Sequence, residues 1–309
     1  MTSPVVFAYH TVGVACLSVL LRHGVAVKLV ITHQDNPNEN IWFDSVAKLA
    51  TANNIPVVTP DDPNTPELTA QIAALKPDFV FSLYYRMMLK PAMLATAGRG
   101  AYNMHGSLLP KYRGRVPINW AIIKGETETG ATLHEMVEKP DAGRIVDQQA
   151  VPILPDDTAL AVFNKVTAAA AKTLDRALPT LIDGSVELRA QNLAAGSYYG
   201  GRKPEDGIIN WDDSAHNIHN LVRAVAPPYP GATTTIKGQA ITITRSELAP
   251  AHFTHSKPGY LNVSSSRCIA LCGDGRMLRV LEARFDGKIR DEATLCGLLG
   301  VGVYPLGIY

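Results

Sequence analysis

The sequence predicts an α/β fold, in which a Rossmann-like, mostly parallel sheet with helices on both faces is followed by a small OB-like β-barrel. Over the first 190 residues, short apolar runs alternate with segments whose apolar residues recur at helical spacing. After a stretch rich in glycine and proline at residues 194–207, the pattern changes to short strand-like runs at regular spacing. We therefore expect two domains, an α/β domain at residues 1–203 and an OB-like domain at residues 204–309.

The first domain is expected to begin with a strand at residues 5–9 and a helix at residues 14–22, which Gly24 ends. Thr65, Pro66 and Glu67 supply an N-cap, a proline at the first helical position and an acid in the first turn, and predict a helix to residue 75. Helical spacing also predicts helices at residues 42–52 and 157–182. Further strands are predicted at residues 25–32, 55–58, 79–84, 101–104, 131–137 and 145–153.

The second domain is expected to open with a helix at residues 214–225, for which Asp213 is the candidate cap. Lys237-Gly238 and Gly273-Asp274-Gly275 have the composition of hairpin turns. The predicted strands around them are residues 233–236, 241–244, 260–263, 268–271 and 278–282.

Charge and composition exclude several classes of function. The 309 residues carry 29 Lys and Arg against 28 Asp and Glu, a net charge of +1, which predicts no nucleic-acid partner. No apolar stretch is long enough to span a membrane, and residues 1–4 lack the basic start of a secretory signal. The four cysteines are scattered without zinc-site spacing, so we expect reduced thiols, no metal and a cytoplasmic protein. The turn after the first strand lacks G-x-G-x-x-G, so NAD is not expected as a cofactor.

Residues 101–143 contain the side chains best suited to chemistry. Asn103 and His105 stand two apart at the end of a predicted strand, so they project from the same face, near the edge where open α/β sheets bind ligands. Asp141 follows the next strand, and if the two strands are neighbours its carboxylate can face the imidazole. An aspartate beside a histidine favours the protonated imidazolium, and with an amide it can stabilise an oxyanion and move a proton. This set suits acyl transfer to a nucleophile that the substrate brings.

Other polar residues are harder to assign. Lys111, Arg113 and Arg115 lie in one irregular loop, where they can steer an anionic substrate or remain solvated. A lone histidine is usually structural or solvated, and we assign that role to His10, His23, His33 and His134.

The run Asn103-x-His105-Gly-Ser107-Leu-Leu-Pro110-x-x-Arg113-Gly114, followed by Asp141-Ala-Gly143, resembles the signature of the 10-formyltetrahydrofolate-dependent formyltransferases. This long, gapped pattern is specific, and the likeness extends over nearly the whole chain, because that family pairs a Rossmann-like domain with an OB-like barrel. The resemblance implies that His105 transfers a proton, Asn103 stabilises the transition state and Asp141 favours the protonated form of His105. It also implies 10-formyltetrahydrofolate as co-substrate.

Within this family, six stretches resemble the branch that formylates UDP-4-amino-4-deoxy-L-arabinose: residues 7–10, 32–37, 81–86, 109–115, 201–206 and 222–232. Lipid A modification and polymyxin resistance are the processes that this branch implies. The resemblance places the folate contacts at Met87, Met88, Leu89, Arg115, Val137, Glu138, Lys139, Pro140 and Asp141. Met87-Met88 departs from the pattern of the branch. In bifunctional members a UDP-glucuronic acid decarboxylase domain follows; this chain ends before it, so we expect a separate decarboxylase as functional partner.

Two alternatives stay open. Methionyl-tRNA formyltransferases share the core signature, but residues 201–309 carry 12 basic and 10 acidic side chains, without the clear excess of positive charge that a tRNA-binding barrel needs. A catalytically silent folate- or nucleotide-binding module is the other alternative, and the intact Asn103, His105 and Asp141 argue against it. The oligomeric state and the identity of the sugar and its nucleotide are not readable from the sequence.

Overall fold

The computed structural model describes residues 2–252 and 257–307, and backbone contacts divide the chain into two compact units. The first unit contains residues up to 117 together with residues 128–152 and 163–200. The second contains residues 118–127, 153–162 and those from 201 onward. Within the described ranges, no helix combines the length and apolarity needed to cross a membrane.

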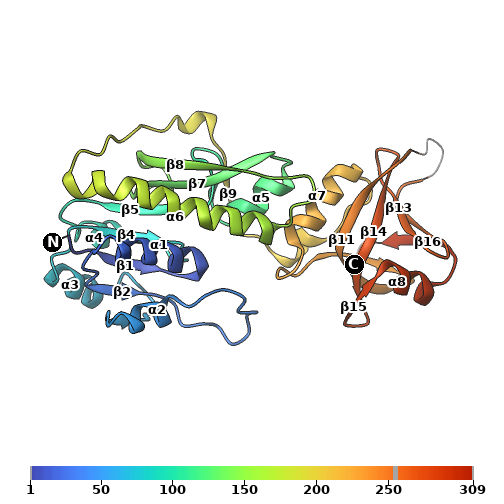
Figure 1. The fold of residues 1–309 in the computed structure, drawn as a ribbon. Coiled ribbons are helices and arrows are strands. Elements are labelled where there is room, and N and C mark those ends of the chain that lie inside the picture. Colours follow the sequence, from blue (N-terminus) through green and yellow to red (C-terminus); the bar gives the residue numbers. More distant parts are fainter. Residues whose placement is uncertain (1, 253–256, 308–309) are drawn as a thin grey trace. The chain divides into compact units, whose positions relative to one another are not determined.

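The first unit is built on a mixed, mostly parallel seven-stranded sheet with the order β3-β2-β1-β4-β5-β7-β8 (Figure 1). Strands β1 to β5 pair in parallel, whereas β7 runs antiparallel to both β5 and β8. The strands are β1 (Val5–Ala8), β2 (Leu29–Ile31), β3 (Val57–Val58), β4 (Val80–Leu83), β5 (Ala101–His105), β7 (Glu128–Glu135) and β8 (Ile145–Pro152). The predicted α/β class is confirmed, and the one reversed strand, β7, brings chain segments near β5 that a wholly parallel sheet would not.

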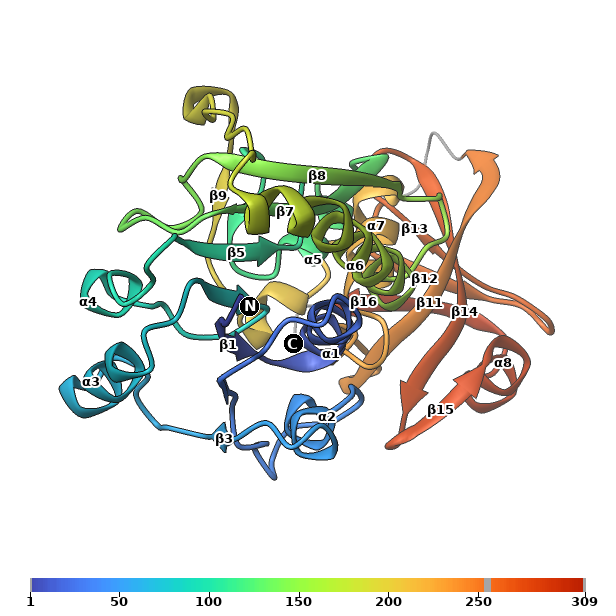
Figure 2. The ribbon, with the colours of Figure 1, turned by 60° about the vertical axis from the view of Figure 1, so that its left-hand side comes forward.

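Helices cover both faces of this sheet. Figure 2 shows α1, α2 and α6 on one side of it and α3 and α4 on the other. On the latter side, Leu68 and Ile72 of α3 and Met93 of α4 pack against Val5 and Phe7 of β1 in a buried cluster. The helices of the chain up to residue 183 are α1 (His10–Arg22), α2 (Val46–Ala52), α3 (Pro66–Ala74), α4 (Pro91–Leu94), α5 (Pro117–Ile123) and α6 (Ala159–Asp183).

Side-chain caps determine where several helices begin. Thr65 caps α3 as predicted, because its hydroxyl accepts from the Leu68 N–H. The helix predicted at residues 42–52 is shorter, since Ser45 caps α2 and residues 42–44 lie outside it. The prediction of Asp213 as the cap of α7 (Ala215–Val225) was wrong by one residue: the Ser214 hydroxyl accepts from Asn217 N–H, and Asp213 instead accepts from the Ser214 N–H.

Short elements connect the sheet to the second unit. A parallel pair joins β6 (Arg113–Gly114) to β9 (Tyr198–Tyr199), so the loop after β5 is held by a segment more than eighty residues later in the chain. Two 3-10 turns, Leu193–Ala195 and Pro204–Gly207, flank β9.

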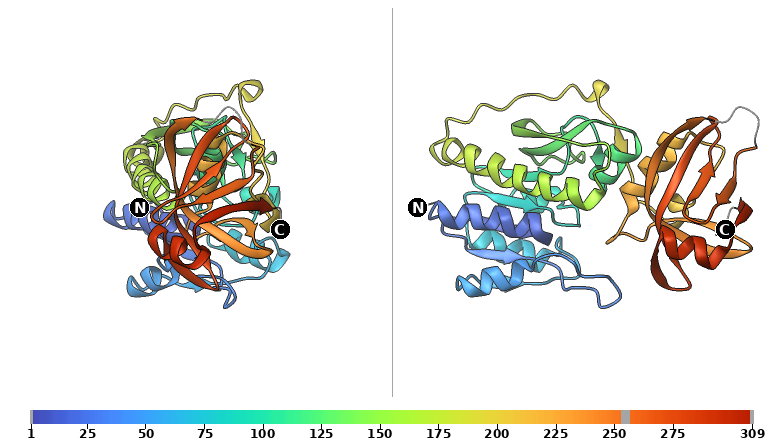
Figure 3. Two further views of the ribbon diagram at one scale, coloured as in Figure 1. Left: turned by 90° about the vertical axis from the view of Figure 1, so that its right-hand side faces the viewer. Right: turned by 45° about the vertical axis from the view of Figure 1, so that its right-hand side comes forward.

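The second unit contains a closed antiparallel barrel, drawn in orange and red in Figure 3. Its strands follow the order β11-β10-β16-β12-β13-β14, and pairing of β11 with β14 closes the ring. Trp211, Ile243, Leu278 and Leu295 are among the residues of its buried core. The elements are β10 (Ala232–Ile236), β11 (Gln239–His252), β12 (Tyr260–Val263), β13 (Cys268–Leu271), β14 (Arg276–Phe285), β15 (Lys288–Asp291), α8 (Glu292–Leu299) and β16 (Gly302–Gly307). The predicted small barrel is thus confirmed.

Candidate active site

The carboxyl end of β5 presents an amide and an imidazole. Asn103 and His105 are two residues apart on this strand, so they share one face of the sheet. His105 is only 6% exposed, whereas Asn103 is partly exposed. A buried imidazole needs partners for both ring nitrogens, and the structure supplies an oxygen for each.

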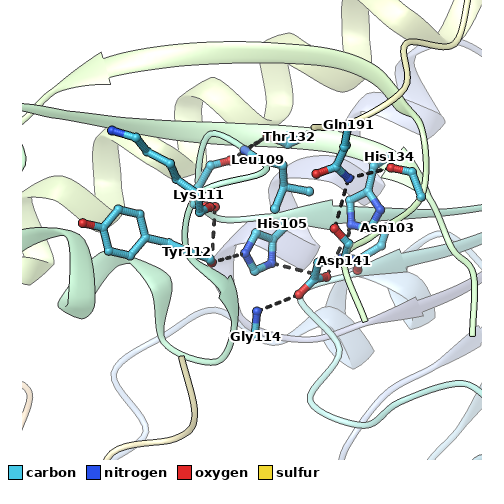
Figure 4. A network of polar contacts seen from close by, with 12 residues as sticks. Asn103, His105, Leu109, Lys111, Tyr112, Gly114, Thr132, His134, Asp141 and Gln191 are labelled. Carbon is cyan, nitrogen blue, oxygen red and sulfur yellow. Dashed lines mark hydrogen bonds and ion pairs between the residues drawn. The ribbon is translucent and has the colours of Figure 1, made fainter. Parts of the chain in front are cut away.

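Both nitrogens of His105 face oxygen atoms (Figure 4). Nε2 lies 2.8 Å from the carbonyl oxygen of Tyr112, which can only accept, so this nitrogen carries a proton and donates. Nδ1 lies 3.7 Å from Oδ1 of Asp141. Oxygen acceptors thus flank the ring on both sides, within hydrogen-bond distance at Nε2 and beyond it at Nδ1.

Asp141 reaches the imidazole from a loop that folds back over the sheet. β7 lies beside β5, as the sequence-based hypothesis required, but runs antiparallel to it, with Asn103 opposite His134. Residues 136–143 therefore emerge beside the start of β5, where the Met136 N–H donates to the Ala101 carbonyl, rather than beside His105. The Oδ2 atom of Asp141 accepts a hydrogen bond of 2.8 Å from the Gly114 N–H.

The charge of this carboxylate is stabilised by its neighbours. Burial raises the pKa of Asp141, but the facing imidazole of His105 and the Gly114 N–H lower it by more than burial raises it, so that the pKa lies well below its ordinary value. Asp141 is therefore ionised at neutral pH and is the counter-charge available to a protonated His105.

His134 belongs to this constellation, and its assignment as an isolated structural or solvated histidine missed that. Its Nδ1 lies 2.7 Å from the carbonyl oxygen of Glu135, so Nδ1 carries the proton and Nε2 is an acceptor in the neutral ring. Nε2 accepts from Nδ2 of Asn103 across 3.1 Å and lies 3.5 Å from Oδ1 of Asp141. The pairing of β5 with β7 was the missing signal, because only that register places His134 beside Asn103.

Gln191 is a second residue that sequence reasoning missed. Its Nε2 donates to the carbonyl oxygens of Asp141, at 3.0 Å, and of Gly143, at 2.6 Å (Figure 4). Asp141 has a left-handed backbone with φ of 51°, and a Cβ on Gly143 would lie 2.0 Å from the Glu135 carbonyl oxygen. Gln191 thus bridges both ends of a tight turn, and no motif in the sequence marks it.

Hydrogen bonds within the site also hold the loop that carries Tyr112. The Thr132 hydroxyl donates to the Ser107 carbonyl and accepts from the Leu109 N–H. The Ser107 hydroxyl donates to the Lys111 carbonyl across 2.7 Å. These contacts hold the Tyr112 carbonyl where His105 meets it.

The residues predicted to contact folate differ in their exposure to solvent. Met87, Met88 and Val137 are exposed apolar side chains, with 41%, 56% and 42% of their surface accessible, whereas Leu89 is buried. Arg115, Glu138 and Lys139 are exposed, and Pro140 and Asp141 are partly buried. Exposed apolar side chains of this kind are available to contact a partly apolar ligand.

Models of known families match both parts of the chain. The formyl transferase model matches residues 14–178, and the model of the formyl transferase C-terminal domain matches residues 202–295. This chain belongs to the formyl transferase family. The site built on Asn103, His105 and Asp141 lies within the segment that the first of these models matches.

Solved structures of other formyl transferases share the fold. The N-formyltransferase from Helicobacter canadensis, in complex with folinic acid and dTDP-3-aminofucose, is 23% identical, with a TM-score of 0.73 over 91% of this chain and 99% of that one. WlaRD, a sugar 3N-formyl transferase solved with dTDP and 5-N-formyl-THF, is 23% identical, with a TM-score of 0.71 over 90% and 97%. A sugar N-formyltransferase from Shewanella sp. FDAARGOS_354 is 20% identical, with a TM-score of 0.64 over 79% and 96%.

Proposed function

We propose that this formyl transferase moves the formyl group of 10-formyltetrahydrofolate to the amine of a nucleotide-linked amino sugar. The observation that carries the proposal is the meeting of Asn103, His105 and Asp141 at the end of β5, in a chain that belongs to this family. The acceptor class is supported by two structural neighbours, one solved in complex with dTDP-3-aminofucose and the other a sugar 3N-formyl transferase.

In this mechanism the sugar amine attacks the formyl carbon, and a new C–N bond forms as the bond to N10 of the folate breaks. Asn103 uses one Nδ2 hydrogen on His134, and its second N–H is the donor we assign to the developing oxyanion. The amine loses a proton and N10 gains one, with the imidazolium of His105 as the proton carrier and Asp141 as its counter-charge. The products are the N-formyl sugar and tetrahydrofolate.

We assign the folate to the surface formed by residues 87–89, Arg115 and residues 137–141. The exposed apolar side chains of Met87, Met88 and Val137 suit the ring system, and the cation of Arg115 suits an acidic group of the folate. The two neighbouring structures solved with folinic acid and with 5-N-formyl-THF support this choice of co-substrate. On this assignment residues 1–203 contain the catalytic centre and residues 204–309 the accessory domain.

The finer proposal for the acceptor is UDP-4-amino-4-deoxy-L-arabinose. It rests on the six sequence stretches that resemble the branch acting on this sugar, whereas the ligands named for the neighbours carry dTDP. A separate UDP-glucuronic acid decarboxylase would then act earlier in the same route, and the N-formyl product would serve lipid A modification and polymyxin resistance.

The test is formyl transfer from 10-formyltetrahydrofolate to a panel of UDP- and dTDP-linked amino sugars, with methionyl-tRNA as the contrast. We expect turnover with at least one amino sugar and none with methionyl-tRNA. Replacement of His105 by alanine is expected to lower turnover about 10²- to 10⁴-fold at saturating folate. Near-full turnover in His105→Ala, or faster transfer to methionyl-tRNA than to every sugar, would contradict the proposal.

A further inference from the structure

Arg113 is a buried cation whose side chain has no partner within the described part of the chain. The residue is 9% exposed, and its Nε is enclosed without a hydrogen bond. Across residues 2–252 and 257–307, its guanidinium makes no hydrogen bond, ion pair or ring contact. Only Nε is fully enclosed, so the two outer Nη atoms remain within reach of a ligand.

The other strongly buried arginine shows how this chain normally accommodates such a group. Arg223 is 7% exposed, and its guanidinium donates to Oδ1 of Asn220 and to the carbonyl oxygens of Leu154 and Asp157. A guanidinium stays charged at every physiological pH, and leaving it desolvated and unpaired is costly. Residues 2–252 and 257–307 supply no such acceptor to the Arg113 side chain, which points to a partner from outside the chain.

The backbone of Arg113 lies beside the catalytic constellation. The residue before it, Tyr112, offers its carbonyl to His105, and the residue after it, Gly114, donates its N–H to Asp141. The backbone N–H of Arg113 is itself tied to the Ser197 carbonyl in the pairing of β6 with β9. A ligand group bound by Arg113 would therefore be held by the same tripeptide that holds His105 and Asp141.

We infer that Arg113 is an oxyanion subsite, which binds a phosphate or carboxylate group of a substrate through its outer guanidinium nitrogens. This inference rests on the proposed function, because both substrates carry such a group: the nucleotide sugar a diphosphate and the folate a glutamate carboxylate. Guanidinium matches the two oxygens of either group in a bidentate geometry.

The test measures binding without turnover, so that it does not depend on finding the right acceptor sugar. Thermal unfolding of the wild type, Arg113→Met and Arg113→Lys is followed alone, with UDP, with dTDP and with folinic acid. Arg189→Met is the matched control, because Arg189 is an exposed arginine with no hydrogen bond or ion pair from its side chain among the described residues.

The subsite predicts that Arg113→Met without ligand unfolds at the same temperature as the wild type or higher, because an unpaired charge leaves the interior. A nucleoside diphosphate or folinic acid is expected to raise the unfolding temperature of this variant less than that of the wild type. The smaller rise corresponds to a Kd that is roughly 10- to 100-fold higher. Loss of the UDP and dTDP response identifies the diphosphate as the anion, and loss of the folinic acid response identifies the carboxylate. Arg113→Lys keeps the positive charge but lacks the planar guanidinium that can bind two oxygens at once, so the same ligand is expected to bind this variant more weakly than the wild type.

Unchanged responses to all three ligands in both Arg113 variants would overturn the subsite. A large drop in the unfolding temperature of Arg113→Met, with ligand responses like those of the wild type in Arg113→Lys, would also overturn it, because the cation would then serve the fold. A failure of the proposed function alone would leave ligand binding and its dependence on Arg113 intact.

Discussion

Asn103 on β5 and His134 on β7 lie opposite each other in the antiparallel register, and Nδ2 of Asn103 donates to Nε2 of His134 across 3.1 Å. The Glu135 carbonyl holds the proton of His134 on Nδ1, so the acceptor on Nε2 is fixed. This chain of bonds orients the Asn103 amide with its nitrogen toward His134 and Asp141, and sets which atom of the amide can meet an oxyanion.

His134→Ala is therefore expected to lower kcat about 10- to 100-fold while the KM values change little, because a misoriented oxyanion donor acts on the transition state. His134→Gln, whose side-chain carbonyl can accept from Asn103, is expected to recover part of the loss. Steady-state kinetics of the two variants provide the measurement. Equal kcat in the alanine variant and the wild type would show that Asn103 needs no such support.

Gln191→Ala is expected to lower kcat about tenfold and to leave the KM for the acceptor nearly unchanged. The reason is that the Asp141 turn loses two hydrogen bonds and the carboxylate is no longer held opposite Nδ1 of His105. Gln191→Glu is the sharper variant, since a carboxylate of nearly the same shape cannot donate to either carbonyl. If Gln191→Glu retained full activity and a wild-type pH profile, the bridge would have no part in positioning Asp141.

Acidification is expected to destabilise the protein partly through Asp141. Its pKa is depressed in the folded state, so the folded protein takes up the proton at lower pH than the unfolded chain does. The stability that this carboxylate contributes is thus present above the ordinary carboxyl pKa of about 4, and is lost as the pH falls below it.

Urea unfolding of the wild type and Asp141→Asn between about pH 3 and pH 7 measures this contribution, because carboxylates of the unfolded chain titrate in this range. The variant is expected to show a shallower fall in the free energy of unfolding below about pH 4. Parallel pH curves for the two proteins would contradict the assignment of the low pKa to this residue.

Met88→Ser tests the proposed folate surface. Because Met88 is 56% exposed, its replacement is expected to leave the unfolding temperature unchanged, while the loss of apolar contact raises the Kd for folinic acid about 3- to 10-fold. Leu298→Ser removes an apolar side chain of similar exposure, 51%, from the barrel unit and is the control. A similar Kd in all three proteins would remove Met88 from the folate site.

Local rules predicted many of the elements, because they depend on neighbours in the chain. The cap, proline and acid at residues 65–67 do begin α3, and Lys237-Gly238 does turn β10 into β11, with φ positive at both residues. The cap of α7 was placed one residue too early, since Asp213 and Ser214 are both good cap residues and cap preference alone does not choose between them. The period change after residue 200 predicted the barrel, but its closure by β11 and β14 joins strands far apart in the sequence.

The sequence by itself determined the α/β class, the barrel and the chemical set of Asn103, His105 and Asp141, because alternation along one strand and the spacing of turn residues are local properties. Only the tertiary structure decided that His134 orients the amide, that Gln191 bridges the Asp141 turn and that Arg113 is buried with no side-chain partner among the residues that the structure describes. The physical reason is that each of these facts depends on strand register or burial, which are set by segments distant in the chain. No spacing within residues 101–143 could reveal which neighbour each polar group would meet.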